Sequence, residues 1–212
     1  MDAPVIDTPA DRRRRERMVR VQLAGCRDAA VCAAMAEIPR HVFLPDGLRA
    51  GAYDDCARAI GAGQTISQPR LIAAMLAALR IVPGDRVLDV GAGSGYAAVL
   101  LARLSAPGLV LAIERQGSLI AATRERLAHL APSVTLRHGD GLALDDGVFD
   151  VVHIAAACTT PPAGLIARLA PGGRLLAPIG PHDGPQRLLL VADGRETWLD
   201  EVLFVPGLAG VA

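Results

Sequence analysis

The sequence predicts an α/β fold with a doubly wound, mostly parallel sheet. Short apolar runs typical of buried strands alternate along the chain with amphipathic runs typical of helices. The clearest example is the apolar run 87–90, which ends in a glycine turn at 91–95 and is followed by an amphipathic run at 97–104. Ligands of such sheets bind beyond the carboxyl ends of the strands, so we expect the functional site at that edge.

The same patterns place the individual elements. Asp28 is the expected N-cap of a second N-terminal helix, and the apolar residues 42–44 are expected to pin a proline-bounded segment to the core. Two glycines and a proline bracket polar side chains at 61–69, which predicts a shaped loop. Helices are expected at 12–36 with a break at Gly25, 71–79, 97–104, 119–130 and 165–169, and strands at 87–90, 109–113, 134–137, 149–155, 174–177, 188–191 and 201–205.

Composition excludes several classes of protein. The apolar fraction of 51% supports a sizeable core, and 212 residues suit one domain with an embellishment. The formal net charge of zero argues against a nucleic-acid partner, and the apolar runs are too short to span a membrane. The four cysteines lack metal-site spacing and no signal peptide is evident, so we expect a cytoplasmic protein without a metal. Residues 1–16 are expected to form a flexible arm.

The glycine turn and its acidic neighbours indicate the class of ligand. Glycines allow positive φ and a close approach of backbone to a ligand, and the helix that follows presents free N–H groups. The spacing is G-x-G-x-G, whereas the dinucleotide fingerprint is G-x-G-x-x-G. Asp89 precedes the turn, and Glu114 ends the next apolar run about 20 residues on, where a ribose-binding carboxylate is expected. Together they favour a nucleoside ligand over a turn that binds nothing, and S-adenosylmethionine (SAM) over NAD.

Two further segments follow strands and belong to the same expected crevice. Asp140 comes after the apolar run 134–137, and residues 156–159 come after the run 149–155. Because the carboxyl ends of parallel strands meet at one edge, both would line the crevice with Glu114. For Asp140, an Asp-Gly turn with no role in binding is a serious alternative.

Seven segments of the chain match one known pattern: 39–43, 52–55, 60–69, 83–96, 139–141, 171–175 and 204–206. On these segments the chain resembles the protein-L-isoaspartate O-methyltransferase family, from about Met18 to Val205. The glycine turn occurs in many SAM-dependent methyltransferases, whereas the run Gln64–Pro69 looks specific to this family.

The resemblance implies a class I SAM methyltransferase, a Rossmann-like sheet with an N-terminal helical cap. Its divisions would be the arm at 1–16, the cap and acceptor loop at 17–80, and the SAM-binding α/β domain at 81–212. It implies an enzyme that uses SAM as methyl donor and methylates the free α-carboxylate of L-isoaspartyl residues in damaged proteins and peptides. The ester then leaves through a succinimide, which returns part of the chain to normal aspartate. We expect a monomer with isoaspartyl proteins as partners.

The resemblance also implies roles for individual residues. Ser67 would be the active-site residue, and Gln64, Thr65 and Ile66 would bind the acceptor peptide. The alternative for Ser67 is that it caps the helix that starts near Pro69. The cofactor-binding residues would be Gly61, Gly91, Gly93, Ser94, Gly95, Glu114, Asp140 and Gly141.

The chemistry needs few groups from the protein. A carboxylate with a reference pKa of about 4 is already ionised at neutral pH, so no general base is required. A dry pocket that aligns acceptor and donor is enough, and we expect the loop that ends at Pro69 to act as its lid. His153 is expected to be a satisfied structural histidine rather than a base.

Several readings stay open. The chain departs from the family at 56–59, at Cys158 and Thr159, and at Leu203, positions that lie near the acceptor slot in the family. These departures leave room for a tailoring methyltransferase that acts on an aspartate of one biosynthetic peptide. An NAD-dependent oxidoreductase is disfavoured by the glycine spacing and the absence of lysine. A SAM-binding module without catalysis is disfavoured by the presence of Ser67.

Overall fold

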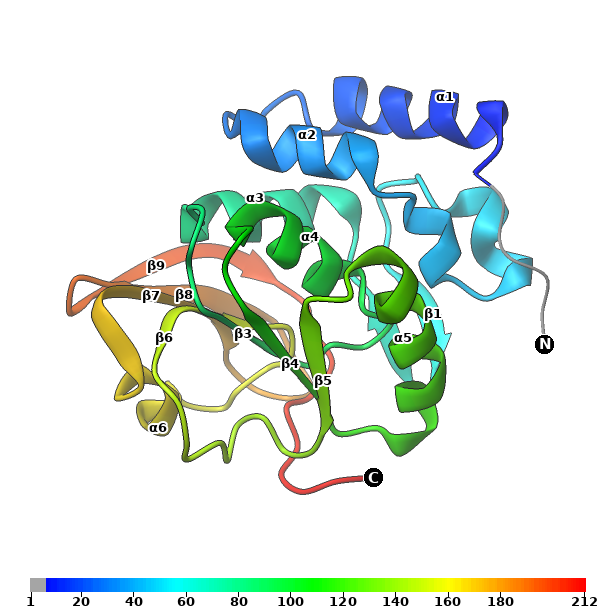
Figure 1. The fold of residues 1–212 in the computed structure, drawn as a ribbon. Helices are drawn as coiled ribbons and strands as arrows, with labels where there is room; N and C mark the ends of the chain where they lie inside the picture. The colour runs from blue at the N-terminus through cyan, green and yellow to red at the C-terminus, as the bar shows by residue number, and fades with distance from the viewer. Residues whose placement is uncertain (1–6) are drawn as a thin grey trace.

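The computed structural model describes residues 7–212 and contains one large sheet and one small one (Figure 1). The large sheet has seven strands in the order β5-β4-β3-β6-β7-β8-β9, and the small sheet is the pair β1-β2. The strands are β1 (Arg58–Gly61), β2 (Gln64–Ile66), β3 (Val87–Val90), β4 (Val110–Glu114), β5 (Val134–His138), β6 (Phe149–Ile154), β7 (Leu169–Ile179), β8 (Gln186–Ala192) and β9 (Arg195–Val202).

The helices are mostly those that the sequence predicts. They are α1 (Pro9–Arg17), the π-helix η1 (Met18–Gln22), α2 (Ala29–Glu37), the 3₁₀-helices η2 (Arg40–Phe43) and η3 (Asp46–Gly51), α3 (Pro69–Leu79), α4 (Tyr96–Ser105), α5 (Gly117–Leu130) and α6 (Ala163–Ile166). The Asp28 side chain accepts hydrogen bonds from the N–H groups of Ala30 and Val31, which confirms it as the N-cap of α2. Among residues 7–212, no helix combines the length and the apolar character that crossing a membrane requires.

The sheet is parallel at its centre and antiparallel at one end. The strands β5, β4, β3, β6 and β7 run parallel to one another, whereas β8 and β9 each pair antiparallel with the strand before them. The β8–β9 connection is a tight turn in which Asp193 and Gly194 both have positive φ, 52° and 69°. This mixed sheet flanked by helices confirms the predicted doubly wound, mostly parallel fold.

Alternate residues of the central strands face two separate cores. Val87, Val151 and Leu176 point to the core that they share with residues of α2, α3 and α4. Their neighbours Leu88 and Val152 point to the opposite core, which is closed by the short α6 and the loop that follows β5. Figure 1 shows α3 and α4 on one side of the sheet and α6 on the other. Burial on both faces explains why these strands appear in the sequence as continuous apolar runs.

Residues 9–17 form helix α1, which differs from the flexible arm expected over 1–16. Thr8 and Asp11 form a capping box, in which the Thr8 hydroxyl accepts from the Asp11 N–H and the Asp11 carboxylate accepts from the Thr8 N–H. Pro9 suits the first helical turn. The helix expected from residue 12 therefore begins three residues earlier, at Pro9, and residues 1–6 lie outside the described residues.

Three further expectations were wrong in their bounds. The shaped loop at 61–69 belongs partly to a β1–β2 hairpin, whose two strands are too short to show periodicity. The last strand lies at 195–202 rather than 201–205, because β9 is an exposed edge strand whose polar sequence hides it. The expected helix at 165–169 is α6 at 163–166, since Leu169 already belongs to β7.

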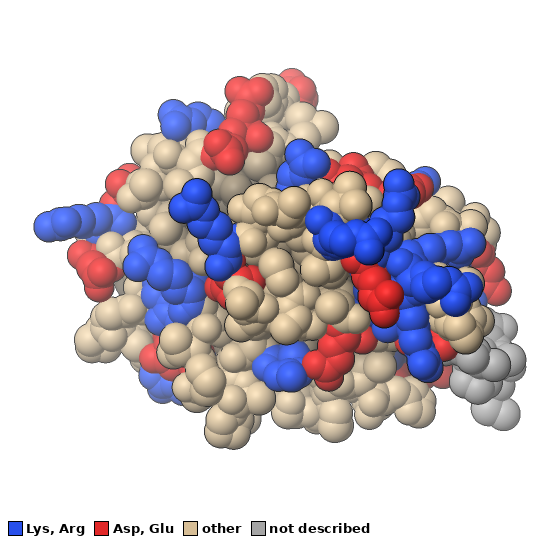
Figure 2. Space-filling view, turned by 90° about the horizontal axis from the view of Figure 1, so that it is seen from above, with Lys and Arg blue, Asp and Glu red and all other residues tan. Residues whose placement is uncertain are grey.

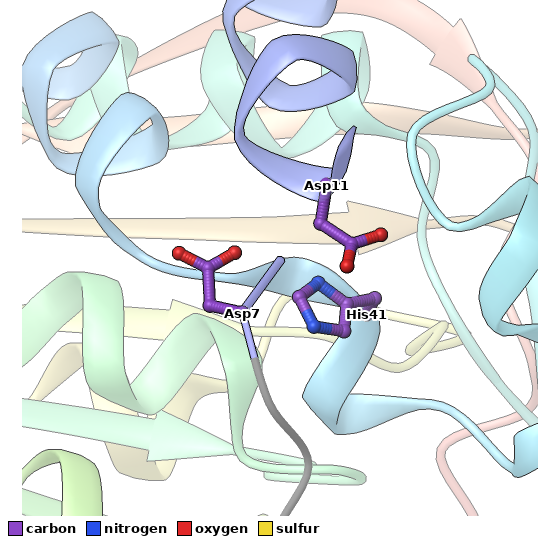
Figure 3. A group of neighbouring side chains, drawn as sticks. All are labelled: Asp7, Asp11 and His41. Carbon is purple, nitrogen blue, oxygen red and sulfur yellow. The ribbon is translucent and has the colours of Figure 1, made fainter. Parts of the chain in front are cut away.

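Arg15 docks α1 onto the rest of the N-terminal region. Its side chain is buried, donates to the Ala36 carbonyl at 2.6 Å and to both carboxylate oxygens of Asp7 at 3.0 and 3.1 Å, and reaches the Tyr53 hydroxyl at 3.3 Å. Asp7, Asp11 and His41 lie beside one another here, and their potential ligand atoms lie within 4.8 Å of one another (Figure 3). Because Arg15 already engages both oxygens of Asp7, this cluster is better described as a docking contact than as a cation site.

We predict that Arg15→Ala lowers the free energy of unfolding by about 2 kcal/mol, because it leaves the Ala36 carbonyl without its donor and the Asp7 carboxylate to the more exposed Arg12. The hydrogen bond from Arg15 lowers the pKa of Asp7. The contribution of the pair is therefore complete above about pH 4 and is lost as the pH falls through the lowered pKa of the folded state. Urea unfolding at pH 7 and pH 3 measures this, with Arg13→Ala, an exposed position on the same helix, as control. Equal losses at both pH values would contradict the role of the ion pair.

Candidate active-site cleft

A cleft opens where β3, β4 and β6 end, at the edge that the sequence predicts. One wall is the glycine turn after β3, and the opposite wall is the hairpin strand β2 with the residue that follows it. The third side is the segment that follows β9. The residues that line the cleft are Gln64, Thr65, Ile66, Ser67, Ile72, Met75, Gly91, Ala92, Gly93, Ser94, Tyr96, Ala97, Glu114, Arg115, His153, Ala155, Ala156, Phe204, Val205, Pro206 and Leu208.

The glycines of the turn have different tasks. Gly91, Gly93 and Gly95 all have positive φ, at 85°, 54° and 91°, which only glycine adopts without strain. Gly91 and Gly93 line the cleft. Gly95 lies outside it and precedes α4, where a Cβ would lie 3.2 Å from the Thr123 methyl group. The third glycine therefore allows α4 and α5 to pack closely, and the first two shape the cleft.

Glu114 holds the glycine turn in place from the end of β4. Its side chain is buried, and one carboxylate oxygen accepts the N–H of Gly93 at 2.7 Å while the other accepts the N–H of Gln116 at 2.7 Å. The Thr123 hydroxyl donates to the Gly93 carbonyl at 2.7 Å, so both polar groups of this glycine are tied down. Each carboxylate oxygen has two lone pairs, so Glu114 can still accept from hydroxyl groups of a ligand in the cleft.

A smaller cavity adjoins the cleft and contains Asp140 and Gly141. The two cavities share Gly91, Arg115, Ala156 and Leu208. One oxygen of Asp140 accepts the N–H of Leu142 at 3.0 Å, which is the Asx turn expected of an Asp-Gly pair. The other oxygen accepts the N–H of Gly210 at 2.7 Å. Asp140 therefore both forms the turn and lines the cavity, so the two roles do not exclude each other.

Arg40 supports the hairpin wall from inside the protein. Its guanidinium is fully buried and donates to the carbonyls of Ala52 at 2.8 Å and Ser67 at 2.7 Å. It also lies over the ring of Tyr96, 5.2 Å from the centroid. Burial lowers the pKa of Arg40 and raises that of Tyr96 to about 12, so the phenol in the cleft wall is neutral at physiological pH.

Ser67 does not cap the helix that follows it. Gln68 occupies the N-cap position of α3, Pro69 is the first helical residue, and no side-chain hydrogen bond caps this helix. The alternative structural role for Ser67 is therefore wrong. Its carbonyl is held by Arg40, and the residue lines the cleft.

His153 and Asp89 are partners on adjacent strands beneath the cleft. They lie opposite each other in the β3–β6 register, and the Nδ1 atom of His153 is 2.7 Å from a carboxylate oxygen of Asp89. Asp89 is fully buried, and His153 is nearly so. The ring is therefore oriented by a buried carboxylate, as expected of a satisfied histidine.

The comparisons with known proteins identify the family. The family model for protein-L-isoaspartate(D-aspartate) O-methyltransferase matches residues 13–209. This chain belongs to the protein-L-isoaspartate O-methyltransferase family. A relative with this name in Methylorubrum extorquens is 49% identical over 93% of this chain and 89% of its own length. Another in Azoarcus is 44% identical, over 93% of this chain and 94% of its own.

The solved structures agree with the fold. A Plasmodium falciparum protein assigned as a protein-L-isoaspartate O-methyltransferase, crystallised with S-adenosyl-L-homocysteine, superposes with a TM-score of 0.80. It is 25% identical, and the match covers 91% of this chain and 97% of that one. The class I, Rossmann-like architecture with its N-terminal helical region is thus shared along almost the whole chain.

Within this family member, the cleft brings together most of the residues singled out from the sequence. Gln64, Thr65, Ile66, Ser67, Gly91, Gly93, Ser94 and Glu114 line it, and Asp140 and Gly141 line the adjoining cavity. Gly61 and Gly95 line neither. Gly61 lies at the end of β1, next to the hairpin turn, where its φ of 101° requires glycine.

Sequence reasoning assigned no role to Arg40, Tyr96, Arg115 or Leu208. Arg40 and Tyr96 stand within segments that match the family, as do residues 204–206, and that match was the available signal. Arg115 directly follows Glu114, and its side chain donates to carbonyls more than ninety positions away. Local sequence carries no trace of such a contact.

The departures from the family pattern lie in different surroundings. Cys158 packs into the core on the α6 side of the sheet, and burial raises the pKa of its thiol to about 11, so it is not a nucleophile at neutral pH. Leu203 is 77% exposed and directly precedes Phe204, which lines the cleft. Of these two departures, Leu203 is the one adjacent in sequence to a residue of the cleft.

We predict that Arg40→Lys loosens the hairpin wall, because a single ammonium cannot reproduce the two-directional contact with Ala52 and Ser67. Amide hydrogen exchange at residues 64–67 is expected to be about tenfold faster, which corresponds to the loss of about 1.4 kcal/mol of local stability. Arg103→Lys, an exposed position on α4, is the matched control. If exchange in the hairpin is the same in both variants, Arg40 does not support this wall.

Proposed function

We propose that this chain transfers a methyl group from SAM to the free α-carboxylate of L-isoaspartyl residues in damaged proteins and peptides. The observation that carries the proposal is the cleft itself, in a member of this family: a glycine turn held by a buried Glu114 faces a hairpin wall with Ser67. The two walls meet in one cavity, so a donor on the first lies against an acceptor on the second.

The residues present fit the proposed cofactor. A nucleoside with a ribose diol needs a buried acceptor with free lone pairs, which Glu114 supplies. An adenine amine needs an acceptor in an adjoining cavity, and Asp140 stands in one. Gly91 and Gly93 leave the backbone open to the rest of the molecule. The cofactor supplies the activated methyl group of its sulfonium.

The remaining residues bind and align the acceptor. The acceptor carboxylate arrives ionised, so no side chain has to remove a proton. We assign to the Ser67 hydroxyl a hydrogen bond to one carboxylate oxygen, which leaves the other oxygen to attack the methyl carbon. Thr65 and Ile66 shape the slot for the peptide, with Gln64 at its rim. Alignment in a closed site supplies several kcal/mol, about 7 or more in good cases.

The product explains the repair. Methylation converts a poor leaving group, a carboxylate oxygen, into a methoxy group. The amide nitrogen of the next residue then attacks the ester carbonyl carbon and methanol leaves, which closes a succinimide. Water opens this ring at either carbonyl, and one of the two products is a normal aspartyl residue.

The surface charge of the chain bears on its partners. On the face seen in Figure 2, acidic side chains stand among the basic ones, and the formal net charge of the chain is zero. Such a surface creates no strong field of one sign, which supports a protein partner rather than a nucleic acid. We propose a monomer that acts in the cytoplasm on isoaspartyl proteins.

The decisive measurement is methyl transfer from labelled SAM to an isoaspartyl peptide and to its normal aspartyl twin of the same sequence. We expect label in the isoaspartyl peptide only, because the acceptor slot receives the free α-carboxylate that the isopeptide linkage exposes. Label in the aspartyl twin only would instead support the tailoring methyltransferase, which the apolar Leu203 next to Phe204 of the cleft favours. No transfer to the isoaspartyl peptide would contradict the proposal.

We predict that Ser67→Ala lowers kcat/KM for the isoaspartyl peptide by about 10- to 100-fold, because a hydrogen bond to a charged group contributes about 1.5–3 kcal/mol. Steady-state kinetics measure the effect, and SAM affinity is expected to stay unchanged. Ser133→Ala, an exposed position away from the cleft, is the matched control. Full turnover in Ser67→Ala would remove this hydroxyl from the mechanism.

A further inference from the structure

The segment 207–212 crosses the carboxyl edge of the sheet next to both cavities. It enters through the Gly207 N–H, which donates to the Ala157 carbonyl at 2.8 Å. At its other end the Ala212 N–H donates to the Arg115 carbonyl at 2.9 Å, and the Ala212 carbonyl accepts the N–H of Gly117 at 2.6 Å. Figure 1 shows this segment in red, beside the ends of the central strands and close to α5. We call it the strap.

Arg115 holds the middle of the strap. Its Nε donates to the Gly210 carbonyl at 3.0 Å, and its Nη2 donates to the Ala209 carbonyl at 3.3 Å. Arg115 directly follows Glu114, the carboxylate assigned to the ribose, and it lines both cavities. One residue thus lies against the site of the cofactor on one side and grips the strap on the other.

Asp140 connects the strap to the opposite end of the same site. One oxygen of Asp140, the carboxylate proposed for the adenine amine, already accepts the N–H of Gly210 at 2.7 Å. Leu208 of the strap lines the cleft and the smaller cavity alike. The strap therefore forms a wall of the adenosine end, and a bound nucleoside would lie between it and the end of the sheet.

The strap is held by contacts that can open. Residues 208–212 are exposed to solvent, and within residues 7–212 the strap is bonded through its backbone groups rather than through buried side chains of its own. Segments with exposed backbone hydrogen bonds and few buried apolar contacts open at low free-energy cost. By contrast, Phe204, which lines the cleft just before the strap begins, is buried.

We propose that the strap closes over the adenosine end of the cleft with Arg115 as its latch, and that its opening controls the exchange of cofactor and product. This rests on the proposed function, because it takes the adenosine site to be where Glu114 and Asp140 place it. Opening breaks the bonds from Arg115 to Ala209 and Gly210 and the bond from Gly210 to Asp140. Closure restores them behind the bound nucleoside.

The test compares the rates at which the full chain binds and releases S-adenosyl-L-homocysteine. In Arg115→Met, which removes both donors of the latch, the association and dissociation rate constants are both expected to rise about tenfold. The dissociation constant then changes less than either rate. Gly210→Ala changes the strap and leaves Arg115 in place. The φ of 74° at Gly210 strains an alanine, so this variant should also raise both rate constants. Arg195→Met on the exposed strand β9 is the control.

Amide hydrogen exchange gives an independent readout on the unmodified protein. Saturating S-adenosyl-L-homocysteine is expected to slow exchange at Gly210 and Ala212, whose N–H groups are the bonded ones. The proposal is overturned if both variants bind and release the nucleoside at wild-type rates, or if the bound nucleoside leaves amide exchange at Gly210 and Ala212 unchanged. A rise in the dissociation rate alone would also overturn it, because it would make Arg115 a direct ligand contact. If the unmodified protein does not bind this nucleoside at all, the proposed function itself is contradicted, and the strap proposal falls with it.

Discussion

The site depends on the bond between the Glu114 carboxylate and the Gly93 N–H. Glycine turns are conformationally free, and within residues 91–95 the bond from the Gly95 N–H to the Ala92 carbonyl closes only one end of the turn. The parallel pairing of β3 with β4 brings the end of one strand next to the turn that follows the other, where the N–H groups of Gly91 and Ala92 donate to the Ile113 carbonyl at 2.9 and 3.1 Å. Glu114 extends this tether by one residue, so the turn is formed before any ligand arrives.

The N-terminal region turns an open sheet edge into a cleft, and a buried arginine makes the connection. Burying a guanidinium away from water is costly, and Arg40 offsets part of that cost with two carbonyls and the face of Tyr96. These three partners come from the loop before β1, the end of the hairpin and the start of α4. Arg40 therefore fixes the position of the hairpin wall relative to the glycine turn, which the two short strands of the hairpin could not do alone.

The cleft is suited to a reaction between a cation and an anion. Two of its wall groups that could exchange protons are held in other roles: the Tyr96 phenol has its pKa raised by burial, and His153 is paired with Asp89. Such a site offers shape and alignment instead of proton transfer, which is what an already ionised acceptor requires. The strap adds a further side, so that Arg115 and Leu208 border both the cleft and the smaller cavity that we propose for the adenosine.

The sequence by itself determined the central strands, the glycine turn, the N-cap at Asp28 and the carboxylate at Glu114, because each is visible in local periodicity or in the spacing of a few neighbouring residues. The family likeness added Ser67 and its neighbours. Only the tertiary structure decided the rest: α1 docked through Arg15, the β1–β2 hairpin, the edge strand β9 and the contacts of Arg40 and Arg115. The bonds from Arg15 to Ala36, from Arg40 to Ser67 and from Arg115 to Gly210 join residues 21 to 95 positions apart in the chain, and a hydrogen bond over such a separation leaves no pattern in the local sequence. The hairpin strands and β9 pair with strands that are adjacent in sequence, but they are too short or too polar to show a periodic pattern. The Arg115 bond exists because the fold brings the end of β4 beside the segment 207–212.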